Sequence, residues 1–184
     1  MDPAEPRWLD EQEHEVWMSL VCLLVRLPAA LELQLQRDAG LNHFEYQVLT
    51  ALSEAPERTL RLSEVAALAE GSLPRLSQVV SRLERRGWVR RTPDPTDGRF
   101  TLAVLTEEGW DQVVAIAPGH VEAVRRHVFD PLTKSQQRQL RAIAQRISAT
   151  TAAANTCSQD RQGLPAAQLA GISKRRAPSD DPVL

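Results

Sequence analysis

Arginine side chains between residues 72 and 99 are the groups in this 184-residue chain whose type and spacing indicate a defined chemistry. That stretch holds seven arginines and three acidic residues, a net charge of +4, whereas the whole chain carries −2. Residues 1–20 are acidic instead, with six carboxylates against Arg7. Guanidinium groups match phosphate oxygens and base edges through paired hydrogen bonds. Because the placement of charge matters more than its sum, the chain can bind nucleic acid despite its negative total.

An amphipathic helix carries much of this charge. Apolar residues recur at helical spacing from Ser72 to about Arg86, and Ser72 suits an N-cap with Pro74 in the first turn. The apolar side consists of Leu73, Leu76, Val79, Val80 and Leu83. The polar side, which can approach base edges in a major groove, consists of Arg75, Gln78, Ser81, Arg82 and Arg85, with Ser77 near the boundary. A solvated helix face has the same pattern, so the helix alone does not decide the function.

A basic β-hairpin is predicted directly after this helix. The apolar period changes to two, and residues 88–92 and 99–105 read as strands around the turn-forming stretch 93–98. Arg90, Arg91 and Arg99 extend the positive field of the helix. Asp97 can accept hydrogen bonds within the loop and hold the Arg99 side chain extended. An arginine at a hairpin tip fits a narrow, negative minor groove, so the hairpin favours binding to double-stranded DNA.

Helices account for most of the remaining chain. They are expected at about residues 11–37, 42–55, 62–69, 106–128 and 133–147. Asn42 with Glu45 has the spacing of a capping box, and so does Thr133 with Gln136. We expect Pro28 to kink or split the first helix, and the Pro118–Gly119 pair to bend or break the fifth. The first helix is apolar on more than one face over residues 17–35, which predicts contact with a second subunit.

Helix, tight turn, helix and basic hairpin in this order describe a winged helix-turn-helix, and the fold class is mainly α with a small β-hairpin wing. Residues 72–109, with Asp97-Gly98-Arg99 followed by Leu105-Thr106-Glu107-Glu108-Gly109, resemble the MarR (multiple antibiotic resistance regulator) family. The resemblance covers about residues 15–150. It implies a homodimeric transcription regulator, usually a repressor, that responds to small phenolic ligands, oxidants or other stress signals.

The resemblance also assigns DNA contacts. In the recognition helix they fall on Ser72, Arg75, Ser77, Gln78, Ser81 and Arg82, and in the wing on Asp97 and Arg99, to which the hairpin charge adds Arg90. Many members have arginine directly after the serine that matches Ser77, where this chain has Gln78. Glutamine prefers adenine where arginine prefers guanine, so the operator is expected to differ at that base pair.

The domain organisation follows from the same resemblance. Residues 41–106 would form the winged helix-turn-helix lobe of a domain spanning 11–155, and residues 11–39 and 107–155 would supply an α-helical dimerisation region. Residues 1–10 are interpreted as an acidic flexible N-terminus and residues 156–184 as a disordered tail. A symmetric dimer would read a pseudo-palindrome with half-sites about 34 Å apart.

Effector binding is a further implication of the resemblance. Trp17, Phe44, Tyr46 and Trp110 are candidates to line a site for a small aromatic or phenolic ligand, although aromatic residues at helical spacing more often form plain core. Cys22 invites comparison with the branch of the family that senses hydroperoxides through a first-helix cysteine. Its apolar neighbours favour a buried, unreactive thiol instead.

Other classes of function find little support in the residues. The chain has no phosphate-cradling glycine loop, nucleophile elbow or suitable carboxylate pair, so we expect no enzyme and no cofactor. Its four histidines form no four-ligand zinc pattern and its two cysteines no disulfide framework. No signal peptide is visible and no uninterrupted apolar run approaches the ~18 residues of a membrane span, which favours a cytoplasmic protein without a membrane partner. The alternative to DNA binding is a winged-helix module that binds protein, which the clustered arginines disfavour.

Overall fold

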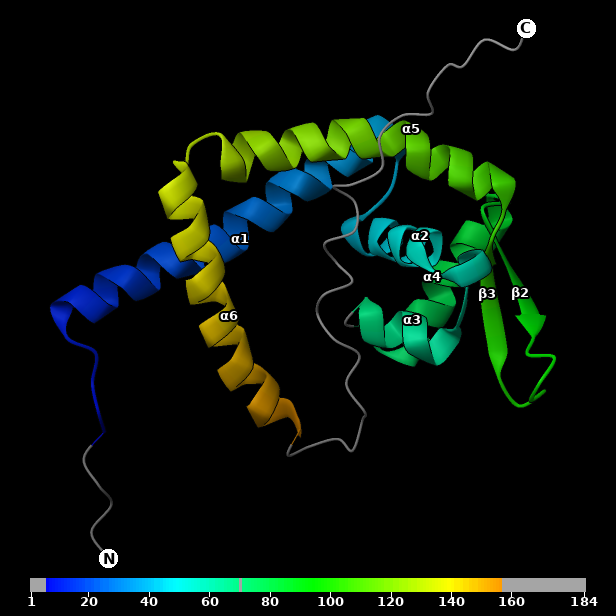
Figure 1. Ribbon diagram of the computed structural model, residues 1–184, viewed down its shortest axis with the longest axis horizontal. Helices are drawn as coiled ribbons and strands as arrows, with labels where there is room; N and C mark the ends of the chain where they lie inside the picture. The colour runs from blue at the N-terminus through cyan, green and yellow to red at the C-terminus, as the bar shows by residue number, and fades with distance from the viewer. Residues whose placement is uncertain (1–5, 70, 157–184) are drawn as a thin grey trace, which may run out of the picture.

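The computed structural model describes residues 6–69 and 71–156, and most of them are helical (Figure 1). The helices are α1 (Glu11–Ala39), α2 (His43–Glu54), α3 (Leu62–Leu68), α4 (Leu73–Arg85), α5 (Glu107–Val124) and α6 (Lys134–Thr156). The strands are β1 (Thr59–Arg61), β2 (Val89–Pro93) and β3 (Thr101–Leu105), and short turns of 3₁₀- and π-helix cover Pro56–Arg58 and Arg125–Phe129. This order confirms the predicted mainly α fold with a hairpin wing. The predicted tail begins at the last described residue, so residues 157–184 lie outside the part described.

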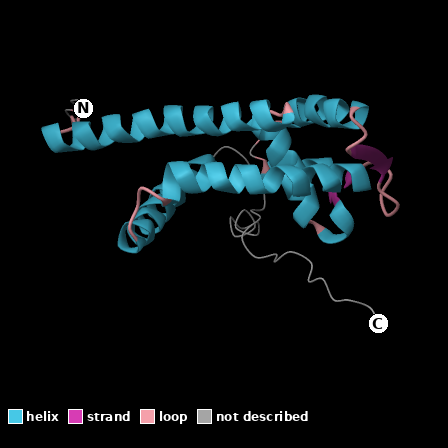
Figure 2. Cartoon of the chain, turned by 90° about the horizontal axis from the view of Figure 1, so that it is seen from above, coloured by secondary structure: helices cyan, strands magenta, loops and turns pink. Residues whose placement is uncertain are grey.

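Both helices with a proline in their interior are continuous, so neither is split or broken at its proline. α1 runs through Pro28, and α5 runs through Pro118; Figure 2 shows α1 as one unbroken helix. A proline removes one backbone hydrogen bond, at a cost of about 3 kcal/mol. α1 and α5 pack along each other, and α2 packs against both, so tertiary contacts offset the loss at each proline.

The core lies in the lobe formed by α2, α3, α4 and the sheet. Fully buried leucines include Leu41, Leu49, Leu52, Leu76 and Leu83. The apolar side of α4 is buried as predicted, except that Leu73, in the first turn, remains 50% exposed. α4 therefore keeps one side against the lobe and leaves the opposite side in solvent.

The sheet has three antiparallel strands in the order β1-β3-β2 rather than the two of the predicted hairpin. Leu60 of β1 lies opposite Ala103 of β3, and Arg91 of β2 lies opposite the same residue on the other side. β1 has only three residues, too few to show a period of two. The extra strand joins the start of α3 to the base of the wing.

Beyond the lobe, α1 and α5 run side by side and α6 leaves the end of α5 at an angle (Figure 1). Large apolar side chains are exposed along all three helices: Trp17, Leu23, Leu24, Val25 and Leu33 on α1, Val114 and Val121 on α5, and Ile143 and Ile147 on α6. The excess apolar surface predicted on the first helix is confirmed.

By length and composition, α1 also qualifies as long and apolar enough to cross a membrane, and among the described residues it is the one helix that does. The apolar stretch is not an uninterrupted run in the sequence, because Arg26 divides it. Length and composition therefore do not by themselves exclude a span at this helix, and the expectation of no membrane partner stays a prediction. In the single chain most of that surface is exposed.

Candidate nucleic-acid interface

The N-terminus of α4 is fixed by local contacts that the sequence predicts. Ser72 caps the helix, because its Oγ accepts a hydrogen bond from the Arg75 backbone N–H at 3.4 Å. Gly71, just before the cap, lies against the Phe44 ring so closely that a Cβ would fall 2.4 Å from Cζ. The turn from α3 to α4 thus lies directly on α2, which sets the position of the helix start.

Arg75 and Gln78 lie on the exposed side of α4, where the sequence analysis placed them. The Arg75 guanidinium carbon lies 4.3 Å above the centre of the Phe44 ring, so a cation–π contact limits the freedom of this side chain. Ser77 and Ser81 are half-buried, and the Ser81 hydroxyl donates to the Ser77 carbonyl at 2.9 Å. The first two turns therefore offer solvent an amide and a guanidinium, the latter held against Phe44.

Arg82 differs from these residues because it has a partner within the lobe. Its Nε donates to Oε1 of Glu45 at 2.7 Å, and the Glu45 side chain is only 7% exposed. Oε2 of Glu45 meanwhile accepts the Asn42 backbone N–H at 3.0 Å, which completes the predicted capping box of α2. Arg82 thus ties α4 to α2, a contact across 37 residues that helix periodicity does not reveal.

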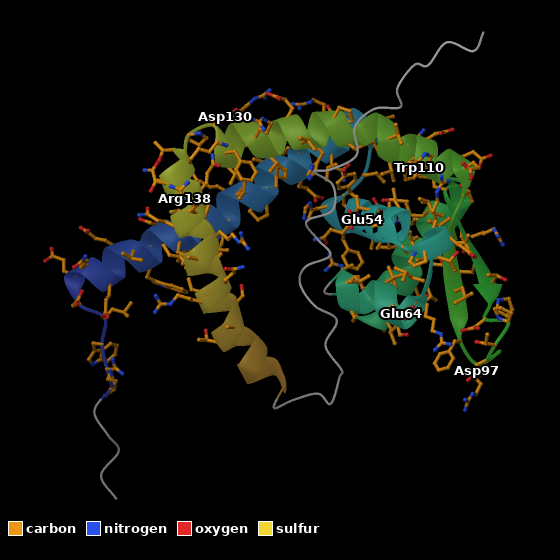
Figure 3. The ribbon with its side chains drawn as sticks, in the orientation of Figure 1. Glu54, Glu64, Asp97, Trp110, Asp130 and Arg138 are labelled. Carbon is orange, nitrogen blue, oxygen red and sulfur yellow. The ribbon has the colours of Figure 1, made fainter. Side chains whose placement is uncertain are left out.

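The wing tip has the geometry that the sequence analysis expected of Asp97 and Arg99. The Asp97 carboxylate accepts the Arg99 backbone N–H at 3.2 Å, Nε at 3.0 Å and Nη2 at 2.7 Å. Hydrogen bonds from Arg99 hold the pKa of Asp97 below its usual value. The Arg99 side chain is nevertheless 85% exposed. Figure 3 labels Asp97 at the end of the hairpin furthest from α5, so this arginine is offered at the tip of the wing.

Arg90 and Arg91 are neighbours in β2 but face opposite sides of the sheet. Arg91 faces α4, where its Nη2 lies 2.6 Å from Oε2 of Glu84 and 2.5 Å from the Ser81 hydroxyl. This pairing lowers the pKa of Glu84 and joins the wing to the recognition helix. Arg90 instead lines a hollow with Arg58 and Glu107, away from α4. Of the nine predicted DNA contacts, six lie on α4 or its N-cap and Asp97 and Arg99 lie at the wing tip, whereas Arg90 faces the hollow beside Arg58 and Glu107.

Asp94 is a site residue that sequence reasoning missed. It lies in the wing loop, only 6% of its surface is exposed, and it accepts hydrogen bonds from Arg61 and Thr96. The one local signal is its spacing from Thr96, typical of an aspartate that caps a turn. Arg61 lies 33 residues earlier in the chain, so its contact with Asp94 required the folded structure.

The four aromatic candidates for an effector site lie in separate environments. Phe44 lines a cavity of about 480 Å³ between α1, α2 and the start of α4, together with Glu32, His43, Gln47 and Arg75 among others. Tyr46 is buried, with its ring centre 4.6 Å from that of His120. Trp110 lies beneath the Arg58 guanidinium, and Trp17 is exposed on α1. In the single chain only Phe44 of the four borders this cavity.

Cys22 is exposed in the single chain, which corrects the expectation of a buried thiol. Its neighbours are apolar as noted, but α1 presents them to solvent rather than to a core. Apolar neighbours in sequence indicate burial only when the helix face they share has a covering partner. Among the described residues, no group of three or more histidine, cysteine, aspartate and glutamate side chains has the arrangement of a metal site.

Half-buried His43 and buried His120 join the lobe to the long helices, and they predict that stability falls on acidification. Burial lowers the pKa of both His43 in α2 and His120 in α5 from 6.5, and His120 Nδ1 lies 3.0 Å from Oε1 of Gln34 in α1. Below about pH 6.5 the unfolded chain binds protons that the folded chain excludes, so the free energy of unfolding decreases as pH falls toward the lowered values.

Urea unfolding at pH 7.5, 6.5 and 5.5 measures this effect. We expect a His120→Gln variant to lose less stability on acidification than the parent, because one of the two groups is gone. His127→Gln, at an exposed histidine, is the matched control and should follow the parent. An identical pH dependence in His120→Gln and the parent would contradict the assignment.

Taken together, a helix-turn-helix with one exposed polar face and an arginine-tipped wing define a winged-helix DNA-binding protein. The family model described as MarR family matches residues 39–99. The HTH-type transcriptional regulator YkoM of Bacillus subtilis is 30% identical over 135 residues, which cover 71% of this chain and 85% of that protein. The chain belongs to the MarR family of transcriptional regulators, which is not a family of enzymes.

Solved structures show the same fold. The MarR family regulator Sco3205 of Streptomyces coelicolor, crystallised in complex with DNA, is 46% identical with a TM-score of 0.76, over 79% of this chain and 91% of that one. CouR of Rhodococcus jostii RHA1, crystallised with p-coumaroyl-CoA, is 28% identical with a TM-score of 0.62, over 72% of this chain and 91% of that one.

Proposed function

We propose that the chain acts in the cytoplasm as a homodimeric repressor that reads a pseudo-palindromic operator in double-stranded DNA. One observation carries the proposal: the exposed side of α4 presents Arg75 and Gln78, while the wing tip holds Arg99 extended on Asp97. A helix with such side chains fits the major groove, and an extended arginine on a narrow finger fits the adjacent minor groove. That Sco3205, 46% identical to this chain, was crystallised in complex with DNA supports DNA as the partner.

The recognition contacts proposed are Ser72, Arg75, Ser77, Gln78, Ser81 and Arg82 in α4, with Arg90, Asp97 and Arg99 in the wing. Their roles differ because their partners differ. Arg75 and Gln78 are exposed and contact bases, whereas Arg82 is held by Glu45 and contributes its remaining N–H groups to the phosphate backbone. Arg90 faces away from α4, so it contributes to the long-range field rather than to the groove.

Dimerisation accounts for the exposed apolar surfaces of α1, α5 and α6. Those helices extend beyond the lobe (Figure 1), and their exposed leucines, valines and isoleucines need a partner in water. A second copy of the chain supplies it and places two recognition helices on successive half-sites about 34 Å apart.

A small aromatic or phenolic effector, linked to a stress response, is the proposed signal. The cavity beside Phe44 supports this, because Arg75 lines it and also belongs to the proposed DNA surface. The ligand in the CouR structure, p-coumaroyl-CoA, contains a phenolic group. An effector that draws Arg75 into the cavity would weaken operator binding.

Selection of bound sequences from random double-stranded DNA tests the proposal, followed by affinity measurements on the selected site. Arg99→Ala should weaken binding to all sequences and flatten its salt dependence, because a wing guanidinium contacts backbone and minor groove. Gln78→Ala should cost about 1–3 kcal/mol at one base pair and relax the preference there. If both variants bind like the parent, the assigned contacts are wrong. If the chain selects no DNA, the proposal is wrong and the alternative of a protein-binding winged-helix module is favoured.

A further inference from the structure

The wing loop contains a carboxylate whose partners lie both inside and outside the loop. Oδ2 of Asp94 accepts Nε of Arg61 at 2.8 Å and lies 2.7 Å from its Nη2. Oδ1 accepts the backbone N–H of Thr96 at 2.8 Å and its hydroxyl at 2.6 Å. Hydrogen bonds from Thr96 and Arg61 lower the pKa of Asp94 to about 2, so it is ionised at neutral pH. Both oxygens of this carboxylate are thus satisfied.

Arg61 connects this carboxylate to the start of the helix-turn-helix. Its backbone N–H donates to Oε2 of Glu64 at 2.8 Å, in the first turn of α3. Its guanidinium carbon lies 4.5 Å above the ring of Phe100, at the other end of the wing loop. Arg61 therefore contacts both ends of the loop that carries Arg99, at Asp94 and at Phe100. The two ends are also joined directly, because the Asp94 N–H donates to the Phe100 carbonyl at 3.0 Å.

We propose that Asp94 and Arg61 are positioning residues that hold the wing loop at a fixed angle to α3 and α4, so that Arg99 reaches the minor groove. The inference rests on the proposed function, in which Arg99 contacts DNA. β1 and the Arg91–Glu84 pair hold the strands of the wing, but the loop between β2 and β3 extends beyond them. A loop that samples several directions lowers the affinity of Arg99 for one groove, because its order must be restored on binding. The contact with Arg61 lies near the end of the hairpin, where it restricts this sampling most.

Stability alone does not explain a charged pair in this place. An ion pair with one buried partner gains little over apolar residues of similar volume, because removing the Asp94 carboxylate from water offsets its attraction to the partly exposed Arg61. What the pair adds is direction, since a guanidinium and a carboxylate meet in few geometries.

A double-mutant cycle on operator binding by the full chain tests the proposal, with Asp94→Asn, Arg99→Ala and the double variant. We expect Asp94→Asn to weaken binding about tenfold and to remove minor-groove protection at the wing position in a hydroxyl-radical footprint. In the Arg99→Ala background the same change should cost no further affinity, because a misplaced wing tip matters only while it carries its arginine. A purely structural role would give losses that add.

The control is Glu107→Gln, which breaks the Arg58–Glu107 ion pair of 3.0 Å outside the wing loop and should leave binding unchanged. If Asp94→Asn fails to fold by circular dichroism, Arg61→Lys replaces it in the cycle, since lysine keeps the charge but loses the paired geometry. If Arg99→Ala binds like the parent, the proposed wing contact is wrong and the positioning role with it. If Arg99→Ala weakens binding while the two losses add, the wing contact stands and the positioning role is wrong.

Discussion

Gly109→Ala is expected to lower the free energy of unfolding by about 3 kcal/mol, the largest stability effect we anticipate from a single methyl group. A Cβ at this position would lie 2.1 Å from the backbone oxygen of Trp88 and 2.8 Å from Cδ1 of Leu105. The Trp88 oxygen cannot move away freely, because it accepts the Thr106 N–H at 3.0 Å. Glycine is needed here for close approach between the start of α5 and the base of the wing.

Urea unfolding monitored by circular dichroism measures the change, with Gly119→Ala as the matched control. Gly119 lies in the same helix, and a Cβ there would meet nothing closer than Oδ2 of Asp38, at 3.4 Å. Alanine favours a helix over glycine by up to about 1 kcal/mol, so the control should be neutral or slightly stabilising. Equal stability of Gly109→Ala and the parent would show that the backbone of Trp88 yields more easily than its contacts imply.

Helix ends could be predicted from the sequence because their signals are local. Ser72 and Thr106 cap α4 and α5, and the Asn42–Glu45 box opens α2, each through contacts within three residues. The close approach at Gly109 shows why the Leu-Thr-x-x-Gly pattern ends in glycine. Such features depend on short spacing and side-chain type, which a single sequence displays directly.

The errors arose where distant contacts decide the outcome. Pro28 and Pro118 are tolerated because α1 and α5 pack along each other, which the local rule for proline does not include. Cys22 is exposed because the apolar face that it shares has no covering partner in the single chain. Strand β1 was missed because three residues carry no periodic signal.

The arginines illustrate the same division within the site. Their clustering predicted a basic surface, but the sequence could not distinguish those that are exposed from those that hold the lobe together. Arg75 and Arg99 are exposed, and Arg99 pairs only within the wing tip, whereas Arg61, Arg82 and Arg91 each pair with a carboxylate of another segment. Two of these three partners lie more than 30 residues away in the chain, so only the folded structure separates the two groups.

Leu24→Arg is expected to make the protein monomeric and to reduce operator affinity by about 100-fold or more. Leu24 lies on α1 with 60% of its surface exposed in the single chain, within the apolar surface assigned to the proposed dimer. A buried arginine without a partner charge would oppose association strongly. Each lobe alone would then bind one half-site, and the gain of 10²–10⁴ in affinity that comes from linking two binding modules would be lost.

Sedimentation and titration of the selected operator measure the two effects together, and circular dichroism checks that the monomer is folded. Because the Leu24 side chain is exposed in the single chain, its replacement should leave the lobe intact, so loss of binding would report association rather than unfolding. Leu24→Met, which keeps an apolar side chain of similar volume, is the matched control and should remain dimeric. A Leu24→Arg protein that stays dimeric with the affinity of the parent would place the subunit interface elsewhere on the long helices.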